Sequence, residues 1–278
     1  MTIIADSGST KTTWSLIEKT GKTQTCITSG INPFFLDKAG ILHVLETEFT
    51  LPSEANVSVF FYGAGCIPSK TEVLSEVLKM YFSTEKVSVN TDLLAAARSL
   101  CGQSPGIACI LGTGSNSCYY DGESIVKNVS PLGYILGDEG SGAVLGKKLL
   151  ADILKNQAPG ELAEDFYNTY SITAAEVLEN VYRKPLPNRF LAQYTKFLAK
   201  HLDHPYIVLL IEDAFGEFIR RNLFQYEDCR QSPVHFTGSI AYYFKEQLRE
   251  VLVNSGLLPG RITKDPMEGL IAYHLNTK

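Results

Sequence analysis

The first hundred residues alternate between short apolar runs, typical of buried strands, and segments with helical periodicity. The apolar runs predict strands at residues 2–6, 12–18, 23–29, 57–62 and 86–90. Apolar positions three and four residues apart predict helices at 36–49, from a cap at Ser69 onward, and at 93–100. The Gly/Pro-containing break at residues 102–106 then marks the best domain boundary.

The same pattern restarts after this break, with strands predicted at 107–111, 115–121 and 123–129. Ile4–Ser9 aligns with Ile110–Ser115, and each segment continues from a strand through a Gly/Ser/Thr turn into a second strand. This similarity indicates an internal duplication. Residues 141–225 are predicted to be mainly helical. The remainder predicts a strand at 234–237, a helix at 240–254, a strand at 261–263 and a last helix from Met267.

These elements predict an α/β fold with mixed sheets in two domains. The chain length of 278 residues agrees, because a single hydrophobic core rarely grows beyond about 250–300 residues. We expect the first domain at residues 1–105 and the second at residues 106–265, with a helical insertion at about 150–225.

Composition and charge narrow the classes of function. Lys and Arg number 25 against 30 Asp and Glu, and no basic stripe is present, so nucleic-acid binding is not expected. Apolar runs such as Ile207–Ile211 are far shorter than the roughly 20 residues of a membrane span. The N-terminal residues lack the features of a secretory signal, so we expect a cytoplasmic protein. The six cysteines form no C-x-x-C pair, which argues against a zinc site or a disulfide framework.

Two glycine-containing turns between strands are candidate phosphate sites. In Asp6–Thr12, Gly8 permits close approach to backbone N–H groups, Lys11 adds a cation, and Asp6 could hold Mg²⁺ through water. Gly112–Ser115 is the counterpart in the second half. Each alone could be an ordinary β-turn. Their occurrence in two duplicated halves favours turns that grip a polyphosphate from both sides of a cleft.

Three further segments carry candidate chemistry. Asp92 follows a strand at the sheet end where α/β proteins bind ligands, and it could accept a proton from a substrate hydroxyl, although a helix N-cap is the alternative. The segment Gly137–Gly142 places Asp138 and Glu139 among glycines, which suits sugar hydroxyls, an amide N–H or a metal, with a capped helix start as the alternative. At Gly238-Ser239 the missing side chain could admit adenine or ribose.

Together, and in this order, these five positions resemble the actin-like ATPase superfamily, specifically its BadF/BadG-type branch, which includes N-acetylglucosamine kinases. The resemblance implies two actin-like (ribonuclease H-like) domains with mixed five-stranded sheets flanked by helices and an ATP cleft between them. The last helix, 266–278, would pack back on the first domain. The implied activity is ATP-dependent phosphorylation of N-acetylglucosamine or N-acetylmuramic acid at the 6-hydroxyl. The implied partners are a small-molecule amino sugar and, as an open option, a second copy in a homodimer, but no nucleic acid or membrane.

The resemblance also implies roles for individual residues. Asp92 would be the catalytic base, and Asp6 would position Mg²⁺ through water. The ATP phosphates would contact Gly8, Ser9, Thr10, Lys11, Gly112, Thr113, Gly114 and Ser115. Adenosine would contact Gly238 and Ser239, and the sugar would contact Asn32, Asp92, Asp138 and Ser141.

Two other functions stay open at this point. An ATPase activator of an iron–sulfur dehydratase or reductase would need clustered thiolates, for which Cys101, Cys109 and Cys118 are the nearest set. A non-catalytic sugar sensor would use the same binding residues. The segment Ser130–Gly133 departs from the Gly-Gly-aromatic-Gly turn that the kinases place near the acetamido group, so the identity of the sugar stays open.

Overall fold

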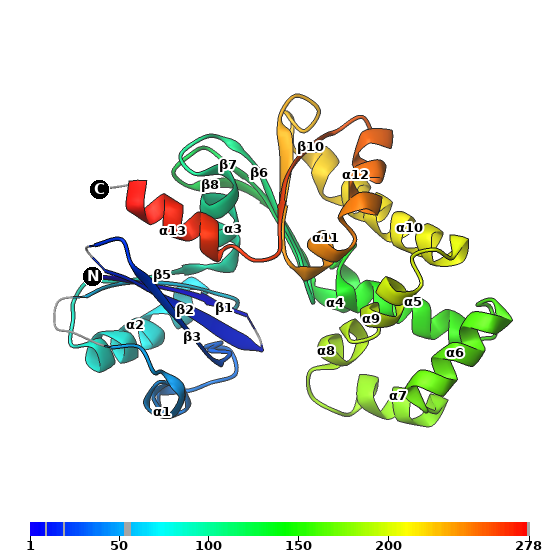
Figure 1. The fold of residues 1–278 in the computed structure, drawn as a ribbon, viewed down its shortest axis with the longest axis horizontal. Helices are drawn as coiled ribbons and strands as arrows, with labels where there is room; N and C mark the ends of the chain where they lie inside the picture. Colours follow the sequence, from blue (N-terminus) through cyan, green and yellow to red (C-terminus); the bar gives the residue numbers. More distant parts are fainter. Residues whose placement is uncertain (9, 19, 53–56, 277–278) are drawn as a thin grey trace. The chain divides into compact units, whose positions relative to one another are not determined.

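The protein divides into two compact units, shown in a computed structural model that describes the chain apart from Ser9, Lys19, residues 53–56 and residues 277–278 (Figure 1). Unit 1 comprises Met1–Ser104, Gly122–Ser124 and Pro266–Lys278. Unit 2 comprises Pro105–Asp121 and Ile125–Asp265. Because the chain returns to unit 1 at Pro266, nearly all of unit 2 is inserted between two segments of unit 1.

Unit 1 is built on a five-stranded mixed sheet in the order β3-β2-β1-β4-β5. The strands β1, β2 and β3 form an antiparallel meander, whereas β4 runs parallel to β1 and β5 runs parallel to β4. The strands are β1 (Thr2–Ser7), β2 (Lys11–Ile17), β3 (Thr23–Ser29), β4 (Ser58–Gly63) and β5 (Val87–Thr91). The helices are α1 (Lys38–Glu48), α2 (Pro68–Phe82), α3 (Asp92–Cys101) and α13 (Met267–Asn276).

Both faces of this sheet are covered by helices (Figure 1). Alternate residues of β1 point to opposite faces, so Ile3 joins a core with α1 and α2, while Ile4 joins a second core with α3 and α13. Trp14 is fully buried in the first core, and its Nε1–H donates to Thr28 Oγ1 at 3.0 Å. The return of α13 to unit 1 thus completes the covering of the second face.

Unit 2 has a second five-stranded sheet, in the order β10-β9-β6-β7-β8. Its strands are β6 (Gly106–Leu111), β7 (Ser115–Tyr120), β8 (Ile125–Val129), β9 (Pro233–Thr237) and β10 (Leu258–Thr263). Its helices are α4 (Gly133–Leu136), α5 (Gly142–Leu154), α6 (Gly160–Tyr170), α7 (Ala174–Tyr182), α8 (Pro187–Ala192), α9 (Thr195–Lys200), α10 (Pro205–Arg221), α11 (Ser239–Tyr243) and α12 (Lys245–Asn254), with a 3₁₀ turn at Leu223–Gln225.

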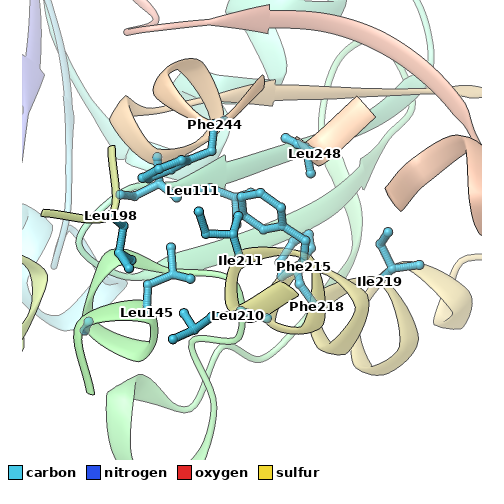
Figure 2. Close-up of a cluster of buried hydrophobic side chains, with 14 of the residues drawn as sticks. Leu111, Leu145, Leu198, Leu210, Ile211, Phe215, Phe218, Ile219, Phe244 and Leu248 are labelled. Atoms are coloured by element: carbon cyan, nitrogen blue, oxygen red, sulfur yellow. The ribbon is translucent and has the colours of Figure 1, made fainter. Parts of the chain in front are cut away.

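The core of unit 2 joins the sheet to α5, α10 and α12. Figure 2 shows Leu111 at the end of β6 among aliphatic and aromatic side chains from these helices, including Leu145, Phe215 and Leu248. All four side chains are fully buried. Since Leu111 directly precedes the candidate turn Gly112–Ser115, this core fixes the point at which that turn begins. Within the described part of the chain, no helix is both long and apolar enough to cross a bilayer.

The two sheets have the same topology, in agreement with the predicted duplication. Read from the opposite edge, the second sheet is β8-β7-β6-β9-β10, which matches β3-β2-β1-β4-β5 strand for strand. The predicted alignment, however, is wrong by two residues. The last antiparallel pairs are Ser7↔Thr12 and Leu111↔Ser115, so Gly8 corresponds to Gly112 and not to Gly114. The sequence alignment matched one glycine to another. The equivalent residues are instead defined by the strand ends, and the two alignments differ because the two turns differ in length.

Two predicted element boundaries are also wrong. Helix α2 begins at Pro68 after Ile67, and no side chain caps it, so Ser69 lies inside the helix. Proline at the first helical position supplies a suitable φ without losing a hydrogen bond. The helix predicted at 240–254 is divided at Phe244, whose backbone leaves the helical region while its ring stays buried. The ring of Phe244 packs in the core of unit 2 at the point where the helix is divided.

The close approach of α13 to α3 generates a test of the unit 1 core. A Cβ on Gly269 would lie 2.3 Å from the carbonyl oxygen of Ser99. We therefore expect Gly269→Ala to lower the free energy of unfolding by about 1–3 kcal/mol, as overpacked cores do, in urea titrations. Gly216→Ala in α10 is the matched control, because nothing lies within 4 Å of its added Cβ. This control should be neutral or stabilise by roughly 0.5–1 kcal/mol, and equal effects of the two substitutions would contradict the close packing.

Candidate functional site

The candidate residues of unit 1 gather where its parallel strands end. The register pairs Ser7 of β1 with Gly63 of β4, and Gly63 with Thr91 of β5, so these three residues form one row. Neighbouring strands lie about 4.8 Å apart, so the row spans about 10 Å from Ser7 to Thr91. The turn after Ser7 and the carboxylate after Thr91 therefore lie at one edge of one sheet, the edge at which α/β proteins bind ligands.

The first candidate turn lies at the β1 end of this row. The Gly8 N–H donates to the Lys11 carbonyl at 3.0 Å and closes the hairpin. The Lys11 side chain is exposed, and it forms no ion pair with a described residue. The Thr10 N–H likewise finds no acceptor among the residues described. Ser9 lies outside the described residues. The turn thus offers a cation and a backbone donor, while the partly exposed Asp6 supplies carboxylate oxygens, the ligand type that Mg²⁺ prefers.

Two buried hydroxyl groups tie this turn to the segment that carries Asn32. Ser7 Oγ lies 2.6 Å from Thr12 Oγ1 and donates to the Ile31 carbonyl at 2.9 Å. The Ile31 N–H points at both hydroxyls, at 3.0 and 3.1 Å. Ser7 and Thr12 are almost completely buried. The hydroxyl-rich composition of the turn is therefore partly structural, since it positions the residue immediately before Asn32.

Asn32 is held against the turn that follows β4. A Cβ on Gly65, whose φ is +76°, would lie 2.3 Å from Asn32 Oδ1, so only glycine leaves room there. The Phe34 N–H donates to the same Oδ1 at 2.9 Å, which assigns the oxygen. Asn32 Nδ2 donates to no described acceptor and remains available to a ligand. The sequence reasoning missed Gly65, although the Gly63-Ala64-Gly65 stretch after a predicted strand was a signal for a close approach.

Asp92 is the first residue of α3, and the structure corrects the alternative that it caps the helix. The cap is Thr91, whose side chain accepts the Leu94 N–H at 3.2 Å. Asp92 Oδ1 accepts the Leu93 N–H at 2.8 Å, and no described side chain donates to this carboxylate. Burial raises the pKa of Asp92, partly offset by the backbone N–H groups of Leu93 and Asp92. A carboxylate with a raised pKa and no ion-pair partner is suited to accept a proton.

Cys66 lies beside this carboxylate. Burial raises the pKa of the Cys66 thiol to about 12, and the negative charge of Asp92 contributes. The thiol is therefore neutral near pH 7 and is not a nucleophile. Cys66 directly follows the Gly63–Gly65 turn and lies beside Asp92, so the turn and the carboxylate are close together within unit 1.

The second candidate turn lies in unit 2 and presents two free backbone donors. Gly112 N–H donates to the Gly114 carbonyl at 2.9 Å, and the carbonyls of Gly112 and Thr113 accept the N–H groups of Gly142 and Ala143 at the start of α5. The N–H groups of Thr113 and Gly114 donate to no acceptor among the described residues. Two successive unpaired backbone amides are suited to bind an anion.

Asp138 braces this second turn. Its Oδ1 accepts the Ser115 N–H at 3.1 Å, and a Cβ on Gly114 would lie 3.1 Å from Oδ2. Asp138 is 8% exposed and has φ +55°, a conformation that Asp and Asn tolerate better than other side chains. Burial raises the pKa of Asp138, opposed by the hydrogen bond from Ser115. The structure thus brings two predicted residues together, Asp138 and Ser115, which the sequence had assigned to the sugar and to the phosphates.

The neighbours of Asp138 have structural partners. Ser141 is fully buried and caps α5 by accepting the Val144 N–H at 3.3 Å, which confirms the alternative of a capped helix start. Glu139 pairs with Arg221 at 2.7 Å. We therefore expect Ser141 to act on a ligand only through the position of the α5 start.

The third unit 2 segment, Gly238-Ser239, requires glycine for packing. Gly238 has φ +116°, and an added Cβ would lie 2.3 Å from the Leu111 carbonyl oxygen. Close approach of β6, and not of a ligand, therefore explains the missing side chain. Ser239 follows as the first residue of α11. This contact places the start of α11 directly beside the residue that precedes the second candidate turn.

Each unit by itself carries groups suited to phosphates or to a divalent cation. Unit 2 has the amides of Thr113 and Gly114, which have no acceptor among the described residues. Unit 1 has the Lys11 cation, the Thr10 amide and the Asp6 carboxylate. The thiols proposed for a cluster fit less well, because Cys109 and Cys118 are fully buried within the unit 2 sheet. A metal cluster needs thiolates that face a common cavity or surface.

Comparison with solved structures finds similar chains over nearly the whole length of this one. A provisionally named N-acetylglucosamine kinase from Porphyromonas gingivalis is 47% identical, with 99% of each chain covered and a TM-score of 0.93. Another provisionally named N-acetylglucosamine kinase, from Chromobacterium violaceum, is 20% identical, with 98% of each chain covered and a TM-score of 0.74. MamK bound to AMPPNP is 15% identical, with 100% of this chain and 98% of that chain covered and a TM-score of 0.51, and shares the actin-like fold.

Other comparisons add no relatives. Protein-family models give no match to the sequence, and neither do curated proteins. The fold expected from the resemblance, two mixed five-stranded sheets flanked by helices, is confirmed by the sheet topology and these structural neighbours.

The burial of Asp138 generates a prediction for stability. Because its pKa is raised in the folded protein, Asp138 lowers the stability as pH rises from the unfolded to the folded pKa, and the loss is complete above the folded pKa. We expect Asp138→Asn to be at least as stable as the wild type at pH 7, since Asn keeps an acceptor for Ser115 and tolerates φ +55°. Asp138→Ala loses both and should cost roughly 2 kcal/mol. Thermal unfolding between pH 4 and 8 measures both, and a less stable Asn variant at pH 7 would contradict this account.

Proposed function

The chain belongs to the N-acetylglucosamine kinase family of the actin-like ATPase superfamily, and on that premise we propose that it transfers the γ-phosphoryl group of ATP to the 6-hydroxyl of an N-acetylated amino sugar. The observation that carries this proposal is the row Ser7–Gly63–Thr91. It sets a cationic, amide-bearing turn about 10 Å from an unpaired carboxylate at one sheet edge. Phosphoryl transfer to an alcohol requires these two functions close together.

In the proposed reaction, Asn32 and Asp92 act on the sugar. The bond from the Phe34 N–H to Oδ1 fixes the orientation of the Asn32 amide, and Nδ2, which has no acceptor among the described residues, can donate to a sugar oxygen. Asp92 orients the attacking hydroxyl and accepts its proton as the oxygen bonds to the γ-phosphorus. Burial of Asp92 supports this role, since the raised pKa makes its carboxylate a stronger base.

Each unit carries its own groups suited to phosphate oxygens. The free amides of Thr113 and Gly114 in unit 2, with Lys11 and the Thr10 amide in unit 1, are suited to stabilise the charge on the phosphoryl oxygens. Asp6 would hold Mg²⁺ through water. When bound, Mg²⁺ would neutralise the negative charge of the phosphates. N-acetylglucosamine and N-acetylmuramic acid both remain candidate substrates, and a cytoplasmic location and a homodimer remain expectations.

The proposed activity can be tested directly. The purified protein is incubated with ATP, Mg²⁺ and separately N-acetylglucosamine, N-acetylmuramic acid, glucosamine or glucose, while ADP release and product mass are followed. We expect sugar-dependent ADP release with one N-acetylated sugar and a product heavier by one phosphoryl group. ADP release that no sugar stimulates would contradict the proposal. Fragmentation of the phosphorylated product shows whether the phosphate is on O6.

Asp92 predicts the pH dependence of the reaction. Since the base must be ionised and its pKa is raised, the acid limb of kcat/KM should have its midpoint above the ordinary Asp value of about 3.9. Asp92→Asn should lower kcat by roughly 10²–10⁴-fold and remove this limb. Asp203→Asn, at an exposed surface carboxylate, is the control and should leave the profile unchanged. A fully active Asp92→Asn variant would exclude the proposed mechanism.

A further inference from the structure

Strand β3 is one edge of the unit 1 sheet, and its hydrogen bonds settle which of its backbone groups point out of the sheet. The Gly30 N–H donates to the Thr10 carbonyl at 3.1 Å, toward β2, whereas the Ser29 N–H donates to the Glu48 carboxylate of α1. Successive residues of an antiparallel strand turn their N–H and C=O groups alternately toward and away from the neighbouring strand. The backbone groups of Ser29 therefore point away from β2.

The other end of β3 gives the same alternation. The Glu18 N–H donates to the Lys22 carbonyl at 2.9 Å, so Lys22 turns its backbone toward β2. Counting from either end, the N–H and C=O groups of Thr23, Thr25 and Ile27 point out of the sheet. Since β3 is the last strand of the described sheet, no strand pairs with them there.

The two described sheets have four edges, and three of them are protected against pairing with another chain. Strand β10 contains Pro259, Arg261 and a register shift, and β8 contains Lys127 and a register shift. All five residues of β5 are partly buried. Strand β3 has seven residues, regular pairing with β2, no charge and no proline, and Ile27 on it is 63% exposed. Such an edge is a template for a further strand.

Charged groups at the two ends of this edge complement each other. Lys22, just before β3, is exposed and forms no ion pair with a described residue. At the other end Glu48 accepts from the Ser29 N–H and hydroxyl, and no described cation pairs with it. A second copy of β3 running antiparallel would bring its Lys22 to this Glu48, and its Glu48 to this Lys22. The edge is therefore complementary to itself about a twofold axis.

Both charged side chains also lie on the same face of the sheet. Lys22 is four residues from Cys26, so the two share a face of the strand. Cys26 packs against the core that β1 and β2 form with α1, and α1 carries Glu48. Residues directly opposite in an antiparallel pair point to the same face. A second copy therefore presents its Lys22 on the face from which Glu48 reaches the edge.

The engagement of Glu48 with the strand backbone selects one register. It leaves Thr23, Thr25 and Ile27 as the outward residues that can pair. The register that uses all three sets Thr25 opposite Thr25 of the second copy, and Thr23 opposite its Ile27. The second copy then turns away at its Gly21, a hairpin glycine with φ +84°, before it reaches Glu48.

We propose that two copies of this chain pair antiparallel through β3, centred on Thr25, and so join the two unit 1 sheets into one sheet of ten strands. Five residues on each side are fewer than the roughly 20–30 of a standard interface. The dimer is therefore reversible, with a dissociation constant in the micromolar range. This pairing does not depend on the reaction proposed above.

The first test measures association by sedimentation velocity over a wide range of concentration. Thr25→Pro removes an outward N–H but no bond to β2, and proline is tolerated on an edge strand. We expect it to weaken association about tenfold or more, because each copy loses a hydrogen bond to the other. Ile27→Lys should also weaken association, since a lysine protects an edge. Val126→Lys, on the β8 edge at a residue 56% exposed, is the matched control and should have no effect.

Thermal unfolding shows that these variants are folded. A wild type that stays monomeric at every concentration overturns the proposal, and so does a dimer that Thr25→Pro and Ile27→Lys leave unchanged.

A charge exchange tests the antiparallel arrangement. Lys22→Glu alone places two acidic side chains together at each end of the dimer, and Glu48→Lys alone places two basic ones together. Each variant should therefore associate more weakly with itself than the wild type does. An equal mixture of the two should form a heterodimer, in which both ends again join opposite charges. A mixture that associates no better than the separate variants overturns this arrangement.

The register is tested by disulfide formation under oxidising conditions. Thr25→Cys should cross-link two copies, since opposite residues in a hydrogen-bonded pair lie about 5.5 Å apart, within the range of a disulfide. Thr23→Cys is the matched control, because it lies four residues along the strand from its counterpart, about 13 Å. The wild type, with its six cysteines, gives the background. Equal cross-linking of the two variants would overturn the register centred on Thr25.

Discussion

The register of the parallel strands is the constraint on which the rest of the structure depends. In each sheet the hydrogen bonds between parallel neighbours align three strands near their ends. The aligned row is Ser7–Gly63–Thr91 in unit 1 and Ile110–Thr237–Thr263 in unit 2, where β6 continues for one more residue. A shift of one residue would turn every side chain of a strand to the other face and expose its core positions. Burial of apolar residues on both faces therefore fixes the row, and the row sets the spacing of every candidate group that follows it.

Duplication gave the two units the same topology, but their turns are stabilised by different chemistry. In unit 1 the buried hydroxyls of Ser7 and Thr12 bind the turn to Ile31. In unit 2 the turn is held by hydrogen bonds between its backbone and two partners, the Asp138 carboxylate and the first backbone amides of α5. The hydroxyl network is neutral, whereas Asp138 brings a negative charge close to a proposed phosphate site. Its raised pKa reflects the cost of that charge in a buried position.

The sequence predicted the strands well because short apolar runs between turns report local burial, and the predicted sites lay at strand ends where the fold places them. It failed where two neighbouring residues suit the same local role, and where the decisive contact is distant along the chain. Thr91, and not Asp92, caps α3, a choice between two suitable neighbours that local preference does not settle. The contact of Asn32 with Gly65 joins residues 33 positions apart. Gly238 matched a ligand-binding pattern, but the backbone of β6 is what it accommodates.

The discontinuity of unit 1 has a consequence for the order in which the chain can fold during synthesis. Unit 2 lies within residues 105–265, so it is complete on the ribosome before α13 has been made. Until then Met267 and Leu270 are missing from one face of the first sheet, and Ile4, Ile17 and Tyr62 lack part of their cover. The unit translated first is therefore finished last, and a nascent chain exposes this apolar face throughout translation of the other unit.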